Sequence, residues 1–89
     1  IYIDIFRRSA YMKTIKISLN SIDKVKTFVN VINRFDAEFD LVSGRYVIDA
    51  KSIMGIFSLD ISKPIDLNIH NADNLDEIME QLQPYLVTE

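Results

Sequence analysis

The most informative stretch of this chain is residues 51–59, Lys51-Ser52-Ile53-Met54-Gly55-Ile56-Phe57-Ser58-Leu59. It places a serine hydroxyl directly before a short apolar run, with a lysine on the N-terminal side of the serine. The first turn of a helix has backbone N–H groups without intrahelical partners and a partial positive charge, so it favours an oxygen acceptor or an anion. The stretch therefore predicts a short helix from near Ser52 to about Leu59, with Ser52 either capping it or carrying a phosphate.

Apolar residues on both sides of this stretch recur at strand and helix periods. Alternation predicts four strands, whose apolar positions are Ile15, Ile17 and Leu19, then Phe39 and Leu41, then Tyr46 and Ile48, then Ile65, Leu67 and Ile69. Helical spacing predicts two further helices, whose apolar stripes are Val25, Phe28, Val29 and Ile32 within 22–35, and Leu75, Ile78, Met79 and Leu82 after residue 74.

Turn and cap residues separate these elements. Ser43-Gly44 predicts a tight hairpin turn between the second and third strands. Asn74 with Glu77 predicts a capping box at the start of the last helix, and Pro84 should kink or end that helix. The resulting order is βαββαβα. Because each strand has one apolar face, we expect an α+β fold whose helices cover one side of the sheet.

Composition places the chain among small globular domains. Its 89 residues suffice for one domain with a limited core. A net charge of −3 disfavours nucleic-acid binding, which needs a basic face. The sequence has no cysteine for a disulfide or a thiolate metal site, which suits a cytoplasmic protein. No apolar run approaches the length of a membrane span, so we expect no membrane partner.

Residues 1–11 are expected to form an N-terminal extension of the domain proper, which covers residues 12–89. The extension begins with the strand-prone run Ile1-Tyr2-Ile3-Asp4-Ile5-Phe6, which is too short for a signal peptide. Two interpretations remain open. It is upstream or vector-derived sequence, or it adds an edge strand or an intermolecular contact, because such segments pair with exposed sheet edges.

The 51–59 stretch and the element order together resemble the HPr family, the small phosphocarriers of the bacterial sugar phosphotransferase system. The Lys-Ser-Ile-Met-Gly string at 51–55 resembles the regulatory-serine segment of that family, and the looser pattern similarity extends from Met12 to about Leu86. The resemblance implies an open-faced two-layer sandwich, with an antiparallel four-stranded sheet in the order 1-4-2-3 and three helices on one face. It also implies a protein that is not itself an enzyme and needs no cofactor.

The histidine that carries phosphate in HPr is missing here. The family motif resembles Gly-x-His-Ala-Arg-Pro, whereas this chain has Leu19-Asn20-Ser21-Ile22-Asp23-Lys24-Val25. The histidine position falls near Ser21, and the arginine position falls near Asp23. A serine would form a stable ester, which is a poor relay, and an acidic residue would repel the phosphate. We therefore expect no histidine phosphocarrier activity and doubt that enzyme I is a partner.

Ser21 remains a possible vestigial phosphoacceptor, although a plain helix cap is the simpler interpretation. Lys24 and Lys26 could attract an anion to the same helix start, but they are better explained as a solvated face. His70, the only histidine, is expected near the surface at the end of the fourth strand and without a catalytic or metal-binding role.

The acidic residues Asp36, Glu38 and Asp40 share one face of a strand, which is typical of a solvated sheet face and not of a metal site.

Ser52 is the leading candidate for a functional site. The resemblance implies phosphorylation of Ser52 by HPr kinase/phosphorylase and recognition of the product by a transcriptional regulator. Lys51, Ile53 and Met54 would form the partner-binding patch, while Phe57 is expected in the core. A phosphate would add nearly two negative charges at the helix start.

The sequence thus predicts a regulatory or binding module switched at Ser52. A phosphocarrier with a displaced or replaced acceptor such as Ser21 remains an alternative, as does a structural remnant without phosphorylation.

Overall fold

The computed structural model describes residues 12–87 and contains four strands, three α-helices and one 3-10 helix within them. In chain order they are β1 (Lys13–Ile17), α2 (Ile22–Ile32), β2 (Glu38–Ser43), β3 (Tyr46–Asp49), α3 (Ile53–Phe57), β4 (Ile65–His70), α4 (Leu75–Gln81) and the 3-10 helix η1 (Gln83–Tyr85). The predicted extension at residues 1–11 lies outside the described residues, and the division at residue 12 remains a prediction.

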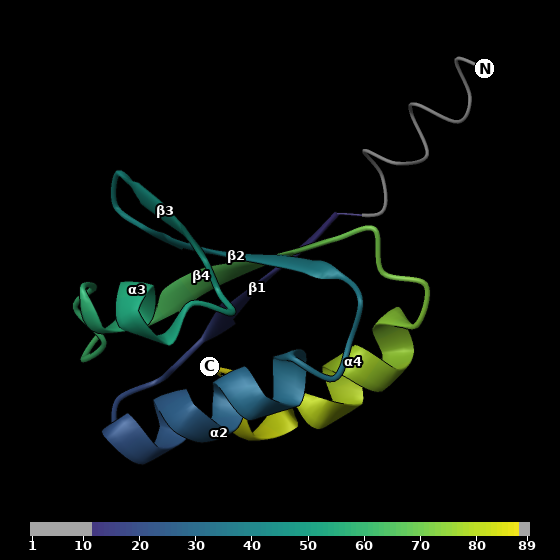
Figure 1. Cartoon of the computed structure of the whole chain (residues 1–89), viewed down its shortest axis with the longest axis horizontal. Helices are drawn as coiled ribbons and strands as arrows, with labels where there is room; N and C mark the ends of the chain where they lie inside the picture. The colour runs from purple at the N-terminus through teal and green to yellow at the C-terminus, as the bar shows by residue number, and fades with distance from the viewer. Residues whose placement is uncertain (1–11, 88–89) are drawn as a thin grey trace.

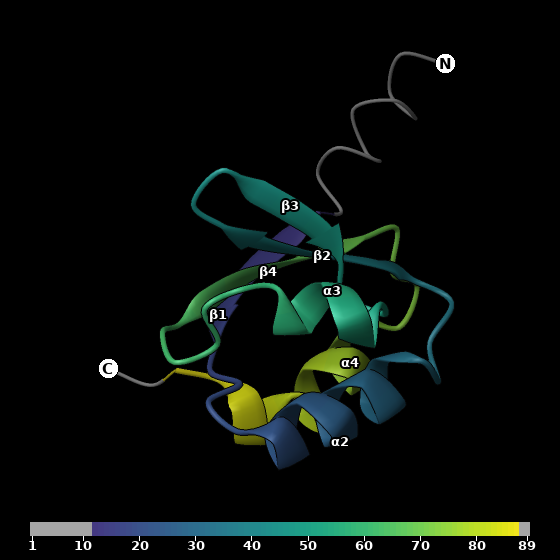
Figure 2. The same cartoon turned by 60° about the vertical axis from the view of Figure 1, so that its left-hand side comes forward.

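The strands form one antiparallel sheet in the order β1-β4-β2-β3. Helices α2 and α4 lie side by side beneath this sheet, and α3 packs on the same side (Figures 1 and 2). The predicted α+β class, the strand order and the single helical layer are therefore confirmed. None of the described helices has the length and apolarity that crossing a membrane would require.

The core lies between the sheet and the helices, because each central strand turns alternate side chains inward. Ile65, Leu67 and Ile69 of β4 are at most 1% exposed, and they meet Phe39 and Leu41 of β2 across the ladder. Alternation with a period of two thus buries the residues that the sequence pattern selected. The free energy gained by this burial is what holds the two layers together.

On its opposite face the sheet is polar along β1 and β4, where side chains of the two neighbouring strands pair. The Thr14 hydroxyl donates to Asn68 Oδ1 at 2.7 Å. Lys16 Nζ lies 3.7 Å from Asp66 Oδ1, with both side chains well exposed. These contacts join β1 to β4, and the exposed ion pair contributes little to stability.

Helix α2 follows the predicted stripe, but it ends earlier than the pattern suggested. Val25, Phe28, Val29 and Ile32 are all buried. After Ile32 the backbone tightens: the Arg34 N–H donates to Val31 O at 3.2 Å, and the Phe35 N–H donates to Ile32 O at 3.1 Å. These i→i−3 bonds close the helix and carry Phe35 into the core as part of a turn.

The start and end of α4 differ in how well the sequence predicted them. Asn74 precedes the helix at φ −121° and ψ 52°, and its side chain makes no capping hydrogen bond, so the predicted capping box is wrong. The helix ends at Gln81, and Pro84 lies in η1, as its missing N–H and fixed φ require. The chain then returns to β1, where the Val87 N–H donates to Lys16 O at 3.0 Å.

Candidate functional site

Ser52 occupies the N-cap of α3, as the sequence predicted. Its backbone is extended, at φ −94° and ψ 100°, and its Oγ accepts a hydrogen bond from the Gly55 N–H at 3.3 Å. Its carbonyl accepts the first helical bond, from the Ile56 N–H at 3.1 Å. The side chain is exposed, so the hydroxyl is both anchored to the helix start and open to solvent.

Gly55 leaves the space that this hydroxyl occupies. A Cβ at position 55 would lie 3.3 Å from Ser52 Oγ and 3.3 Å from Ile48 Cδ1 of β3. A larger residue would therefore press on the serine side chain and on the strand behind it. The glycine in the 51–55 string thus has a local structural reason.

The ammonium group of Lys51 is engaged away from the serine hydroxyl. Its Nζ donates to the carbonyl of Phe35 at 2.8 Å and lies 5.6 Å from the centroid of the Phe39 ring. Its backbone N–H donates to Asp49 Oδ1 at 2.9 Å. Lys51 therefore ties the start of α3 to the turn after α2. Sequence spacing could not have revealed this contact, because the two partners are sixteen residues apart.

Replacing Lys51 with methionine should lower the free energy of unfolding by about 1–2 kcal/mol, because a half-buried charged hydrogen bond and a cation–π contact are lost. Lys63→Met is the matched control. The Lys63 ammonium is exposed, and its contact with Asp60 Oδ2 is long, at 4.0 Å. That change should cost no more than about 0.5 kcal/mol. Urea unfolding of both variants measures the difference, and equal effects would contradict the anchoring role.

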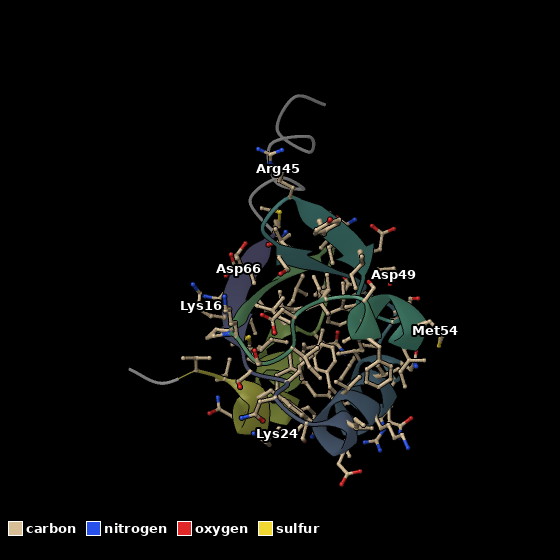
Figure 3. The ribbon with its side chains drawn as sticks, turned by 90° about the vertical axis from the view of Figure 1, so that its left-hand side faces the viewer. Lys16, Lys24, Arg45, Asp49, Met54 and Asp66 are labelled. Carbon is tan, nitrogen blue, oxygen red and sulfur yellow. The ribbon has the colours of Figure 1, made fainter. Side chains whose placement is uncertain are left out.

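An apolar surface adjoins Ser52, and we call Ile53, Met54 and Phe57 the α3 patch. Met54 is 78% exposed and points away from the molecule (Figure 3). Ile53 is half-buried. Phe57 is 40% exposed, so its predicted place in the core is wrong. Ile56 fills the core instead, because a helix of five residues turns only one position fully inward.

Ser21 is the N-cap of α2. Its Oγ accepts the Lys24 N–H at 3.1 Å, and its side chain is exposed. Asp23 lies in the first turn of the same helix, as the sequence indicated. The Lys24 side chain projects from α2 at the far end of the molecule from the β2–β3 hairpin (Figure 3). The structure thus gives Ser21 a capping role and does not test it as a phosphoacceptor.

His70 lies at the end of β4 on the polar sheet face, where its Nε2 is 2.8 Å from Asp40 Oδ2 of β2. Sequence alternation put both residues on this face, but only the strand order makes them neighbours. Asp36, Glu38 and Asp40 join Asp49 and Lys51 around an open hollow of about 410 Å³. Within residues 12–87, no three histidine, cysteine or carboxylate side chains are grouped closely enough to hold a metal ion.

Comparisons with known proteins agree with this fold. The family model described as the PTS HPr component phosphorylation site matches residues 23–87, beginning two residues after Ser21. The crystal structure of phosphocarrier protein HPr from Bacillus anthracis is similar with a TM-score of 0.67 and 31% identity, over 85% of this chain and 95% of that one. A comparison with curated protein sequences gives no match.

Proposed function

The chain belongs to the HPr family of the sugar phosphotransferase system, and on that premise we propose that it is a regulatory module switched by phosphorylation of Ser52. The observation that carries the proposal is the exposed Ser52 hydroxyl at the start of α3, directly beside the α3 patch. In this proposal the module has no histidine phosphocarrier activity, because residues 19–25 contain no histidine.

The proposed reaction is phosphoryl transfer from ATP by an HPr kinase/phosphorylase. The bond between the γ-phosphorus and ADP breaks, a bond from that phosphorus to Ser52 Oγ forms, and the hydroxyl proton passes to a base on the kinase. The product carries about −1.5 to −2 charges and three strong acceptor oxygens beside Met54, which is 78% exposed. Hydroxyl and apolar patch are both at the surface, so the modification changes the docking surface and leaves the core intact.

A transcriptional regulator that reads this surface would need two features. A basic group, best an arginine, would pair with the phosphate through two parallel hydrogen bonds. An apolar groove would receive Met54, whose flexible thioether adapts to different partners. Lys51 would act indirectly in this arrangement, by fixing the start of α3 through its bond to the Phe35 carbonyl.

The second candidate is a phosphocarrier whose acceptor has been replaced by Ser21. The observation in its favour is the exposed Ser21 side chain at the start of α2. Against it, a serine phosphate is a stable ester, and Asp23 places a carboxylate in the same first turn. We therefore rank the Ser52 switch first.

Incubation with HPr kinase and ATP should add one phosphate to the chain, located at Ser52 by intact mass and peptide mapping. Ser52→Asp keeps an N-cap acceptor and should fold normally yet take up no phosphate. Ser21→Ala should be modified as fully as the unaltered protein. If the kinase modifies an authentic HPr and leaves this chain untouched, the proposal fails and the structural remnant becomes the better interpretation.

A further inference from the structure

Strand β3 is an edge strand with two large apolar side chains in solvent. It pairs with β2 on one side, and no other strand of residues 12–87 pairs with it. Tyr46 is 70% exposed and Val47 is 64% exposed, although they point to opposite faces of the sheet. Edge strands usually carry features that discourage pairing with another chain. Here β3 carries exposed apolar residues, flanked by one charge of each sign: Arg45 in the turn before the strand and Asp49 at its end.

The backbone N–H and C=O groups of β3 point alternately toward β2 and toward solvent. The Ala50 N–H donates to Phe39 O of the neighbouring strand at 2.9 Å. Hydrogen-bonded positions alternate along an antiparallel ladder. Tyr46 and Ile48 therefore also turn their backbone N–H and C=O toward β2, whereas Val47 turns its N–H and C=O outward. The Asp49 carbonyl accepts the Ser52 N–H at 3.0 Å, which ends the free edge there.

The side chains along this edge complement a second copy of themselves. In an antiparallel pair centred on Val47, Val47 faces Val47 of the second copy. Arg45, in the turn before β3, then comes next to Asp49 of the second copy, and the two-fold axis repeats this contact at the other end of the pair. Tyr46 then faces Ile48 on the helix side of the sheet. Arg45 lies at the hairpin tip and Asp49 at the far end of β3 (Figure 3). In such a pair of copies, the two ion pairs would therefore flank the apolar centre.

We propose that two copies of this protein associate edge to edge through β3, in antiparallel register centred on Val47. The pairing joins two four-stranded sheets into one of eight strands about a two-fold axis. In this register the two Val47 residues exchange both backbone hydrogen bonds, which matches their outward direction. The alternative register shifted by one residue would set Tyr46 opposite Asp49 and lose both ion pairs.

The proposed contact is short, so the dimer should be weak and reversible. Sedimentation velocity over a concentration series should show reversible dimerisation, and NMR should show amide shifts at residues 45–49 that grow with concentration. Val47→Lys places two like charges opposite each other on the two-fold axis. It should weaken dimerisation at least about tenfold while leaving the monomer folded, because the side chain is already in solvent.

A charge-swap pair tests the register. Arg45→Glu and Asp49→Arg each put like charges opposite one another in the homodimer, so each variant alone should remain monomeric at concentrations where the unaltered chain dimerises. Mixed together they restore both ion pairs and should form a heterodimer. Circular dichroism checks that Asp49→Arg still folds, since Asp49 accepts the Lys51 N–H; should it not fold, Val47→Lys decides alone.

Other outcomes would overturn the proposal. A monomer at all concentrations, or a dimer indifferent to Val47→Lys, would contradict it. Amide shifts confined to Met54 and Phe57 would place association at the α3 patch. Two results together would show that residues 1–6 of a second copy occupy the edge instead: Ile3→Lys abolishes the dimer, and the mixture of Arg45→Glu with Asp49→Arg forms no heterodimer.

Discussion

Incubation with enzyme I and phosphoenolpyruvate is expected to leave this chain without acid-labile phosphate. Transfer through HPr needs a neutral imidazole whose nitrogen attacks phosphorus and yields a labile phosphoramidate, and residues 19–25 contain no histidine. The Ser21 hydroxyl accepts the Lys24 N–H at 3.1 Å. A phosphate on this hydroxyl would be a stable ester, which does not pass its phosphoryl group on. Intact mass measured before and after acid treatment detects any labile phosphate.

The chain offers a sharp control, because His70 is its only histidine. It sits on β4, with Nε2 bonded to Asp40, on the polar face of the sheet. His70→Ala should therefore give the same negative result, while an authentic HPr in the same tube becomes phosphorylated. An acid-labile phosphate that disappears in His70→Ala would mean that a displaced histidine has taken over the relay, and it would favour the carrier alternative over the Ser52 switch.

The fold was predictable because its sequence periods are consistent from one element to the next. Each strand alternates, and the stripe of α2 repeats at helical spacing, so the inward residues can be identified without coordinates. Leu67 and Ile69 on β4 and Val25 and Phe28 on α2 are fully buried, as expected. Strand order is a different matter, since it came only from the resemblance to HPr. Periodicity says which face a strand buries, not which strand it joins.

The candidate site shows where local patterns stop being informative. Ile56 and Phe57 are adjacent on a short helix, and only the packing of α3 against α2 and β3 decides that Ile56 is buried while Phe57 is 40% exposed. The Lys51 contact with Phe35 depends on how two loops meet. The Asn74 cap failed for a local reason, because its backbone is not in the extended conformation that points a side chain at the helix start.

Phe28→Ala should be the most destabilising single change among the aromatic residues of α2 and α3. Phe28 has no exposed surface, and its ring meets Tyr85 edge to face at 5.6 Å between centroids and 75° between planes. Truncation removes apolar surface, leaves a cavity and abolishes the aromatic contact, for a cost of about 3–5 kcal/mol. Small domains have only about 5–15 kcal/mol in total, so Tm should fall by roughly 15–30 °C.

Phe57→Ala provides the matched control, since it deletes the same ring from a position that is 40% exposed on α3. Much of that ring stays in water in the folded chain, so its removal should cost well under half as much as Phe28→Ala. Thermal and urea unfolding of both variants measure the two losses. Similar losses would mean that Phe57 is packed in solution as the sequence pattern first suggested, and that the α3 patch is smaller than the structure shows. A large loss at Phe28 with a small one at Phe57 would leave Phe57 free to contribute to partner binding at little cost to the fold.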